Sequence, residues 1–142
     1  MPQRTAKAAW RGKLKDGAGT VELGSGKFQG KYSFESRFQS GTDTNPEELI
    51  GAAHAACFSM ALSHGLEEAG YSPESIETSA SVSIEKAEGG FAITRIVLDA
   101  QGRVPGIKED AFLEQAEIAK DNCPVSQALA GTDIDLNAKL IS

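Results

Sequence analysis

Residues 45 to 60 constrain the fold more than any other stretch of this chain. Asn45 is a helix-capping residue, Pro46 suits the first helical position, and Glu47 begins a pair of acids in the first turn. The helical pattern then continues to Glu68. We expect this long helix to lie at the centre of the fold, with the rest of the chain packed around it.

The middle of this helix is made of very small residues. From 51 to 56, every side chain except that of His54 is a hydrogen or a methyl group, which allows close packing against another backbone. Glu47 and Cys57 lie ten residues apart, ~15 Å along a straight helix, and cannot touch there. A break between 51 and 56 would remove this separation. It would also place Cys57 in a first helical turn, where the macrodipole favours a thiolate.

The chain before this helix predicts strands. Residues 5 to 14 and 19 to 38 read as strands separated by glycine-containing turns. From Tyr32 to Phe38, aromatic and polar residues alternate, which predicts a strand with its aromatics on one face and Arg37 on the other. From the residues alone, Arg37 on such a strand is most simply a surface charge.

The chain after this helix alternates strands and helices. Residues 76 to 85 and 91 to 101 predict a hairpin, and 105 to 123 a helix whose apolar stripe ends at Cys123. Residues 125 to 130 predict a short helix or turn, and 132 to 140 a final strand. The predicted order is β-β-β-α-β-β-α-β, an α+β fold in one domain over 1–142, with the cysteine-bearing helix packed on an antiparallel sheet.

Composition excludes several classes of function. The net charge of −6 argues against a nucleic-acid partner, which requires clustered Lys and Arg. No apolar run approaches the ~18 residues of a membrane span, so we expect no membrane partner. The first ten residues lack the apolar core of a secretory signal, which predicts a cytoplasmic protein. Two cysteines in such a reducing compartment favour catalytic or unpaired roles, and the absence of C-x-x-C predicts no metal site.

Cys57 has two interpretations. As a small buried residue it would only fill the core. As a nucleophile it needs an ionised sulfur, and a thiol with an ordinary pKa of about 8.5 is mostly protonated at neutral pH. A positive partner must then lower its pKa, and the candidates are Arg37, His54 and His64. His54 shares a helix face with Cys57, whereas His64 is two turns away and too far to act as its base.

Two other functions stay open from the residues alone. A Cys-His hydrolase would use Cys57 with His54 or His64, although no clear orienting acid or amide accompanies either histidine. A binding or dimerisation module would simply keep both cysteines in its core. Cys123 can bond to Cys57 only if their Cα atoms lie within ~7 Å, which sequence spacing cannot show.

Two motifs carry a resemblance to a known family. They are residues 45 to 62, NPEELIGAAHAACFSMAL, and residues 123 to 126, CPVS. At these positions the chain closely resembles the OsmC/Ohr family, which comprises osmotically inducible protein C and the organic hydroperoxide resistance proteins. Residues 91 to 94, FAIT, and 104 to 107, VPGI, look like the OsmC branch, so the resemblance covers nearly the whole chain.

The resemblance implies a thiol-dependent peroxidase of stress defence that acts on organic hydroperoxides and, less efficiently, on hydrogen peroxide. Cys57 matches the peroxide-attacking cysteine, and Cys123 matches the resolving cysteine that forms a disulfide with it. Arg37 looks like the arginine on the strand before the helix, which would stabilise the thiolate. Glu47 matches the carboxylate that pairs with that arginine.

The resemblance also implies what the protein works with. Similar proteins need no metal, haem or other bound cofactor, and an external dithiol reduces their disulfide. Some of them accept lipoyl groups as the reductant. They are intertwined homodimers with both active sites at the interface, and we expect the same assembly here.

Overall fold

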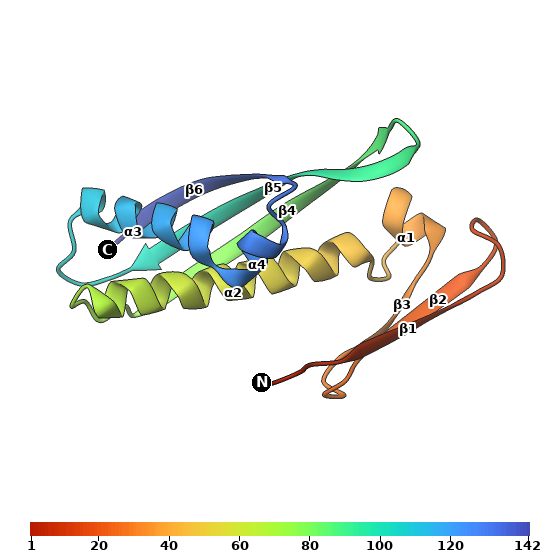
Figure 1. The fold of residues 1–142 in the computed structure, drawn as a ribbon, viewed down its shortest axis with the longest axis horizontal. Coiled ribbons are helices and arrows are strands. Elements are labelled where there is room, and N and C mark those ends of the chain that lie inside the picture. Colours follow the sequence, from red (N-terminus) through yellow and green to blue (C-terminus); the bar gives the residue numbers. More distant parts are fainter. The chain divides into compact units, whose positions relative to one another are not determined.

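The computed structural model describes all 142 residues, from Met1 to Ser142 (Figure 1). Contacts divide the chain into two compact units, residues 1–49 and 50–142. Helix α2, Pro46–Glu68, begins in the first unit and continues through the second. The α+β class is confirmed, while a single domain over 1–142 stays a prediction. Each unit is described by itself.

The first unit contains a three-stranded antiparallel sheet. Its strands are β1, Ala6–Arg11, β2, Ala18–Leu23, and β3, Gln29–Tyr32, in the order β1-β2-β3. The rings of Trp10 and Tyr32 approach to 5.4 Å between centroids over the central strand. Gly19 lies directly beneath them, and a Cβ there would come within 2.6 Å of the Tyr32 ring. This aromatic contact therefore requires glycine at position 19.

The predicted strand through Phe38 is wrong beyond Tyr32. Helix α1, Phe34–Phe38, follows instead, and Ser33 starts it with a capping box. The Ser36 N–H donates to Ser33 Oγ at 3.0 Å, and the Ser33 N–H donates to Ser36 Oγ at 2.8 Å. Phe34 and Phe38 are four residues apart, so a helix also brings their rings together, at 5.0 Å. Arg37 consequently lies on a helix and not on a strand.

The second unit contains a three-stranded mixed sheet. Its strands are β4, Ser75–Ala87, β5, Gly90–Arg103, and β6, Asp133–Ile141. The predicted hairpin is confirmed, because β4 and β5 pair antiparallel. The second pairing differs from the expected antiparallel sheet, since β5 and β6 run parallel. Helices α3, Glu109–Asn122, and α4, Pro124–Ala128, carry the chain back to the start of β6, and such a crossover yields parallel strands.

The core of the second unit lies between this sheet and its helices. Phe58, Leu62 and Leu66 follow one another at every fourth residue of α2, and all three are fully buried. They belong to one apolar cluster with residues of β5 and α3: Ile96, Leu98, Ala100, Phe112, Ala116 and Ala119. A side chain at Gly102 would come within 2.4 Å of the Phe112 ring, so that ring packs directly on the β5 backbone.

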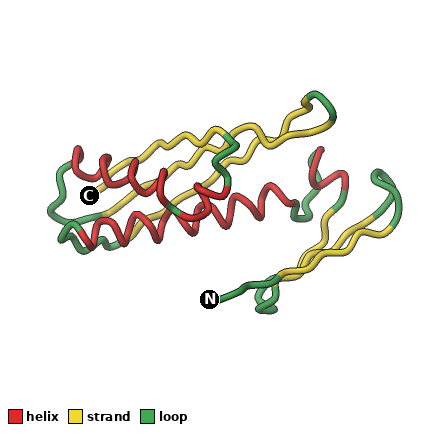
Figure 2. Tube along the Cα trace, in the orientation of Figure 1, coloured by secondary structure: helices red, strands yellow, loops and turns green.

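The expected break in α2 does not occur. The helix runs through all 23 residues without interruption (Figure 2). Alanine has the highest helix propensity, so the Ala-rich middle supports a continuous helix more than it permits a break. The close packing expected from the small residues is confirmed at Gly51, where a Cβ would lie 3.4 Å from Val82 of β4. Cys57 is therefore inside a long helix and not in the first turn of α2, where the macrodipole would favour its thiolate.

Helix α2 also corrects our expectation about apolar length. Its most apolar 18-residue window has a mean hydropathy of 1.3, which by length and composition alone would suffice to cross a membrane. A single helix of this kind is weak evidence, because core helices pass the same test. Only 28% of the window is buried, and one face with Ala52, Ala56 and Met60 is exposed.

Candidate active site

Arg37 and Glu47 form a two-point ion pair within the first unit. Arg37 Nε donates to Glu47 Oε1 at 3.0 Å, and Nη2 donates to Oε2 at 2.9 Å. The Glu47 residue is only 5% exposed, whereas 37% of the Arg37 side chain remains accessible. This parallel geometry fixes the plane of the guanidinium and leaves part of it open to a ligand. The family resemblance predicted that Arg37 and Glu47 pair, and the structure has this ion pair.

Asn45 connects the two short segments that hold this pair. Its side-chain amide donates to the Ser36 carbonyl at 3.0 Å, which ties it to α1. Its side-chain oxygen accepts the Glu48 N–H at 2.8 Å, which caps α2 as the sequence predicted. One side chain thus holds the helix bearing Arg37 against the first turn bearing Glu47.

A largely apolar cavity of about 230 Å³ adjoins Arg37 in the first unit. The aromatic rings of Trp10, Tyr32, Phe34 and Phe38 line it. Arg37 contributes its charge to this lining, and its guanidinium carbon lies 5.3 Å from the centre of the Phe38 ring. A cavity of this composition suits a hydrocarbon group whose polar end meets a guanidinium.

Cys57 and Cys123 meet in the second unit. Cys57 is half-buried on α2, and Cys123 is 1% exposed at the junction of α3 and α4. Both are free, and they are close enough that Cys123 raises the pKa of the Cys57 thiol. Sequence spacing could not show this proximity.

The surroundings of Cys57 within its own unit oppose its ionisation. Burial raises the pKa of the Cys57 thiol, and a hydrogen bond with Cys123 and the charge of that group raise it further. The backbone N–H of Val125 acts in the opposite direction, because it donates to the thiolate. A reactive Cys57 therefore needs a positive group to offset these causes.

His54 does not serve as that positive group. Its ring is completely buried, and burial lowers the pKa of His54, which keeps the imidazole neutral near pH 7. Nε2 lies 2.7 Å from the hydroxyl of Ser126, and Nδ1 has no hydrogen-bond partner. No acid or amide orients the ring, so the Cys-His hydrolase lacks a required element. His64 is exposed on the far part of α2.

Ser126 is a site residue that sequence reasoning missed. It is 4% exposed in the first turn of α4, and its hydroxyl lies 3.1 Å from the Cys123 sulfur. Its N–H also donates to that sulfur at 3.4 Å, so Cys123 caps α4. The only signal in the sequence was its place three residues after a cysteine followed by proline, which is the N3 position of a capped helix.

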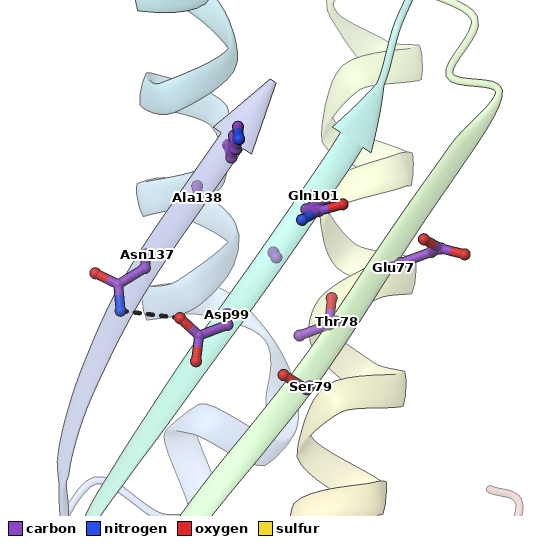
Figure 3. Close-up of a pocket in the computed structure, with 9 residues that line it drawn as sticks. Glu77, Thr78, Ser79, Asp99, Gln101, Asn137 and Ala138 are labelled. Atoms are coloured by element: carbon purple, nitrogen blue, oxygen red, sulfur yellow. Dashed lines mark hydrogen bonds between the residues drawn. The ribbon is translucent and has the colours of Figure 1, made fainter. Parts of the chain in front are cut away.

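A larger pocket of about 480 Å³ lies on the opposite face of the second unit's sheet (Figure 3). Helices lie behind the strands in this view, and Asp99 and Asn137 are joined by a 3.0 Å hydrogen bond in front of them. Its lining contains neither cysteine nor histidine, so it offers no thiol and no imidazole base. No group of three or more His, Cys, Asp or Glu residues in the chain is arranged to hold a metal ion.

Known proteins share both the sequence and the fold. The chain is 51% identical to peroxiredoxin OsmC of Escherichia coli strain K12 over 140 residues. These residues cover 98% of this chain and 97% of that relative. It is 34% identical over 101 residues to the organic hydroperoxide resistance protein OhrB of Bacillus subtilis strain 168, covering 69% and 71% of the two chains. The crystal structure of Bacillus subtilis OhrB matches with a TM-score of 0.68 and 28% identity, over 96% of this chain and 98% of that one.

The family profile described as OsmC-like protein matches residues 39–138. That range contains both cysteines and Glu47, while Arg37 lies just before it. The full-length relatives and the solved structure agree with this match. The chain therefore belongs to the OsmC-like protein family.

Proposed function

We propose that this protein is a thiol-dependent peroxidase that reduces organic hydroperoxides through Cys57 and Cys123. The observation that carries the proposal is the meeting of the two thiols, one half-buried and one fully buried. The half-buried sulfur of Cys57 is the one that a substrate can reach. Cys123 is positioned to react only with its neighbour. The names of the relatives support the same chemistry.

The first step transfers one oxygen atom. The Cys57 thiolate attacks the outer oxygen of the hydroperoxide, the O–O bond breaks, and the alcohol leaves after taking up a proton. Cys57 becomes a sulfenic acid. Cys123 then attacks that sulfur, water leaves, and a disulfide remains for an external dithiol to reduce by exchange. Lipoyl groups are such dithiols, and we propose them as one reductant.

Arg37 is proposed to stabilise the Cys57 thiolate and to hydrogen-bond the peroxide. The need for it follows from the pKa of Cys57, which burial and Cys123 raise within residues 50–142. A guanidinium nearby favours the ionised sulfur. Glu47 holds that guanidinium in a fixed orientation through two hydrogen bonds.

The aromatic cavity beside Arg37 supports a preference for organic substrates. Its lining is mostly apolar, so an alkyl or aryl group of the substrate would bury surface there. Hydrogen peroxide has no such group, which agrees with the weaker activity that we propose for it.

We also propose a homodimer with the active sites at its interface. The support is the exposed apolar face of α2, where Ala52, Ala53 and Ala56 stand beside Met60, itself 76% exposed. Large exposed apolar surfaces mark interfaces. Met60→Glu should shift the protein toward monomer in light scattering; an unchanged dimer mass would argue for a different interface. We place the protein in the cytoplasm, where a reducing environment regenerates dithiols.

Rapid mixing with an alkyl hydroperoxide tests the peroxidase directly. The reduced wild-type chain should lose two hydrogens per subunit by intact mass. Cys57→Ser should show no oxidation, whereas Cys123→Ser should consume about one peroxide per subunit and stall as a sulfenic acid. Equal residual turnover in the two variants would refute the assignment of attacking and resolving roles. A binding module without redox activity would leave all three masses unchanged.

A further inference from the structure

A buried hydrogen-bonded chain leads away from Cys123. The Ser126 hydroxyl lies 3.1 Å from the Cys123 sulfur, and His54 Nε2 lies 2.7 Å from the same hydroxyl. All three residues are between 0% and 4% exposed. Neither Ser126 nor His54 has a part in the peroxidase steps described above. A buried imidazole joined to a reacting thiol through one hydroxyl is a connection that can move a proton.

The hydrogen bonds can all run in one direction. If the Cys123 S–H donates to Ser126 Oγ, the Ser126 hydroxyl hydrogen is free to donate to His54 Nε2. The ring hydrogen then resides on Nδ1, which has no partner of its own. A buried polar atom without a partner costs free energy and calls for an explanation. A ring kept ready to accept a proton at Nε2 provides one.

We propose that Ser126 and His54 carry the proton away from Cys123 when it attacks the oxidised Cys57. This role rests on the peroxidase function proposed above and adds a residue pair dedicated to its second step. Ser126 touches the reacting sulfur, and His54 acts through Ser126 as a positioning residue and final proton acceptor.

The step balances in atoms and electrons. The sulfur electron pair of Cys123 forms the S–S bond, and the S–O bond of the Cys57 sulfenic acid breaks with its pair on oxygen. The Cys123 proton passes to Ser126 Oγ as the Ser126 hydroxyl proton passes to His54 Nε2. Hydroxide leaves at the half-exposed Cys57, and the imidazolium later returns one proton through solvent. The sum is one disulfide and one water, with the oxidant supplied by the peroxide in the first step.

The electrostatics of the cysteine pair give this transfer its timing. A charged Cys123 disfavours a charged Cys57, so the two thiolates compete. Conversion of Cys57 to a neutral sulfenic acid removes this competition before Cys123 attacks. Burial lowers the pKa of His54, so its ring is neutral and able to accept.

The test separates the two steps in time. Reduced protein is mixed with one equivalent of alkyl hydroperoxide. The reaction is quenched at successive times with a sulfenic-acid trap and an alkylating agent, and the products are identified by intact-mass spectrometry. In Ser126→Ala and in His54→Gln, sulfenic acid should form at the wild-type rate. Disulfide should then form about a hundredfold more slowly, the low end of what positioned proton transfer contributes. Glutamine keeps a hydrogen-bonding amide and removes only the basic nitrogen.

Further variants separate proton transfer from simple packing. Ser126→Thr retains the hydroxyl and should restore most of the disulfide rate. The variant with both substitutions should form the disulfide no more slowly than either single variant, because the loss of one group already interrupts the hydrogen-bonded path. His64→Gln, at the exposed histidine of the same helix, should behave as wild type in both steps.

Two results would overturn this role. One is disulfide formation at the wild-type rate in both single variants; the other is an equal loss in both steps, which indicates a structural defect. A wild-type chain that forms no disulfide would instead refute the peroxidase proposal itself. The two failures are therefore distinguishable in one experiment.

Discussion

Replacing Glu47 by glutamine tests whether the ion pair with Arg37 has the role assigned to it. The two side chains share hydrogen bonds of 3.0 and 2.9 Å, and the Glu47 residue is 5% exposed. Glutamine has nearly the same shape but presents an NH₂ group to one of the two guanidinium donors. One hydrogen bond and the negative charge are lost, while the volume of the buried site is kept.

The expected loss of stability is intermediate between that of a buried and a surface pair. Breaking a fully buried ion pair costs about 3–5 kcal/mol, and exposed pairs are worth about 0.2–1 kcal/mol. Here the carboxylate is buried, but 37% of the Arg37 side chain meets solvent, which screens its charge. We therefore expect Glu47→Gln to lower the free energy of unfolding by about 1–3 kcal/mol.

Activity should fall for a separate reason. A guanidinium without its two-point partner samples several orientations, so sulfenic acid formation at Cys57 should slow by about tenfold or more. Urea unfolding measures the stability change, and rapid mixing with an alkyl hydroperoxide measures the rate. Glu48→Gln is the matched control, because the side chain of this exposed neighbour accepts a hydrogen bond from the Thr44 hydroxyl, at 2.7 Å, and makes no hydrogen bond or ion pair with Arg37. A Glu47→Gln variant with both the stability and the rate of this control would contradict the role of the ion pair.

Three further expectations follow from single side chains. Arg37→Ala should raise the pKa of Cys57, so its alkylation profile should move to higher pH; an unmoved profile would count against the arginine. Phe112→Ala should cost about 3–5 kcal/mol in chemical unfolding because the ring is fully buried against Gly102, and a loss under about 1 kcal/mol would contradict that packing. Burial lowers the folded pKa of His54 below the ~6.5 of the unfolded chain, so the unfolded state binds more protons below that pH. The contribution of the neutral His54 to the free energy of unfolding should be fully present above pH ~6.5 and should be lost as the pH falls through the lower folded pKa. Chemical unfolding measured across this pH range should show a smaller loss of stability in His54→Gln than in the wild type.

Local chemistry predicted most of the elements, and it failed where two arrangements satisfy one pattern. The capped start of α2 at Asn45 and the β4–β5 hairpin followed from residue types and periodicity. The segment from Phe34 to Phe38 fits a strand by its alternation and a helix by its four-residue spacing. A capping box of two serines decided between them, and it is visible only in the three-dimensional contacts. The parallel pairing of β6 depends on where a crossover returns the chain, which no local pattern specifies.

The candidate site was predictable to different degrees. The assignment of Arg37 to Glu47 came from family resemblance, because spacing alone made Arg37 an ordinary surface charge. The proximity of Cys57 and Cys123 required the tertiary fold. Ser126 lies in the CPVS motif, but nothing in that motif indicated its contact with His54, which is 72 residues away. Contacts of this kind arise from packing α4 on α2, which sequence periodicity does not describe.

The continuous α2 helix changes how the chemistry of Cys57 has to be explained. A broken helix would have supplied a positive dipole at the thiol; the unbroken one does not, and burial together with Cys123 raises the pKa of Cys57. The neutral His54 cannot compensate, because burial lowers its own pKa and its Nε2 is bonded to Ser126. The N-terminus of α2 and the imidazole of His54 are therefore both excluded as the positive group, and within this unit the Val125 N–H at the start of α4 is what lowers the pKa of Cys57. Among the positive groups considered, the guanidinium of Arg37 remains the one that we propose for stabilising the attacking thiolate, and we propose that His54 acts on the resolving thiol.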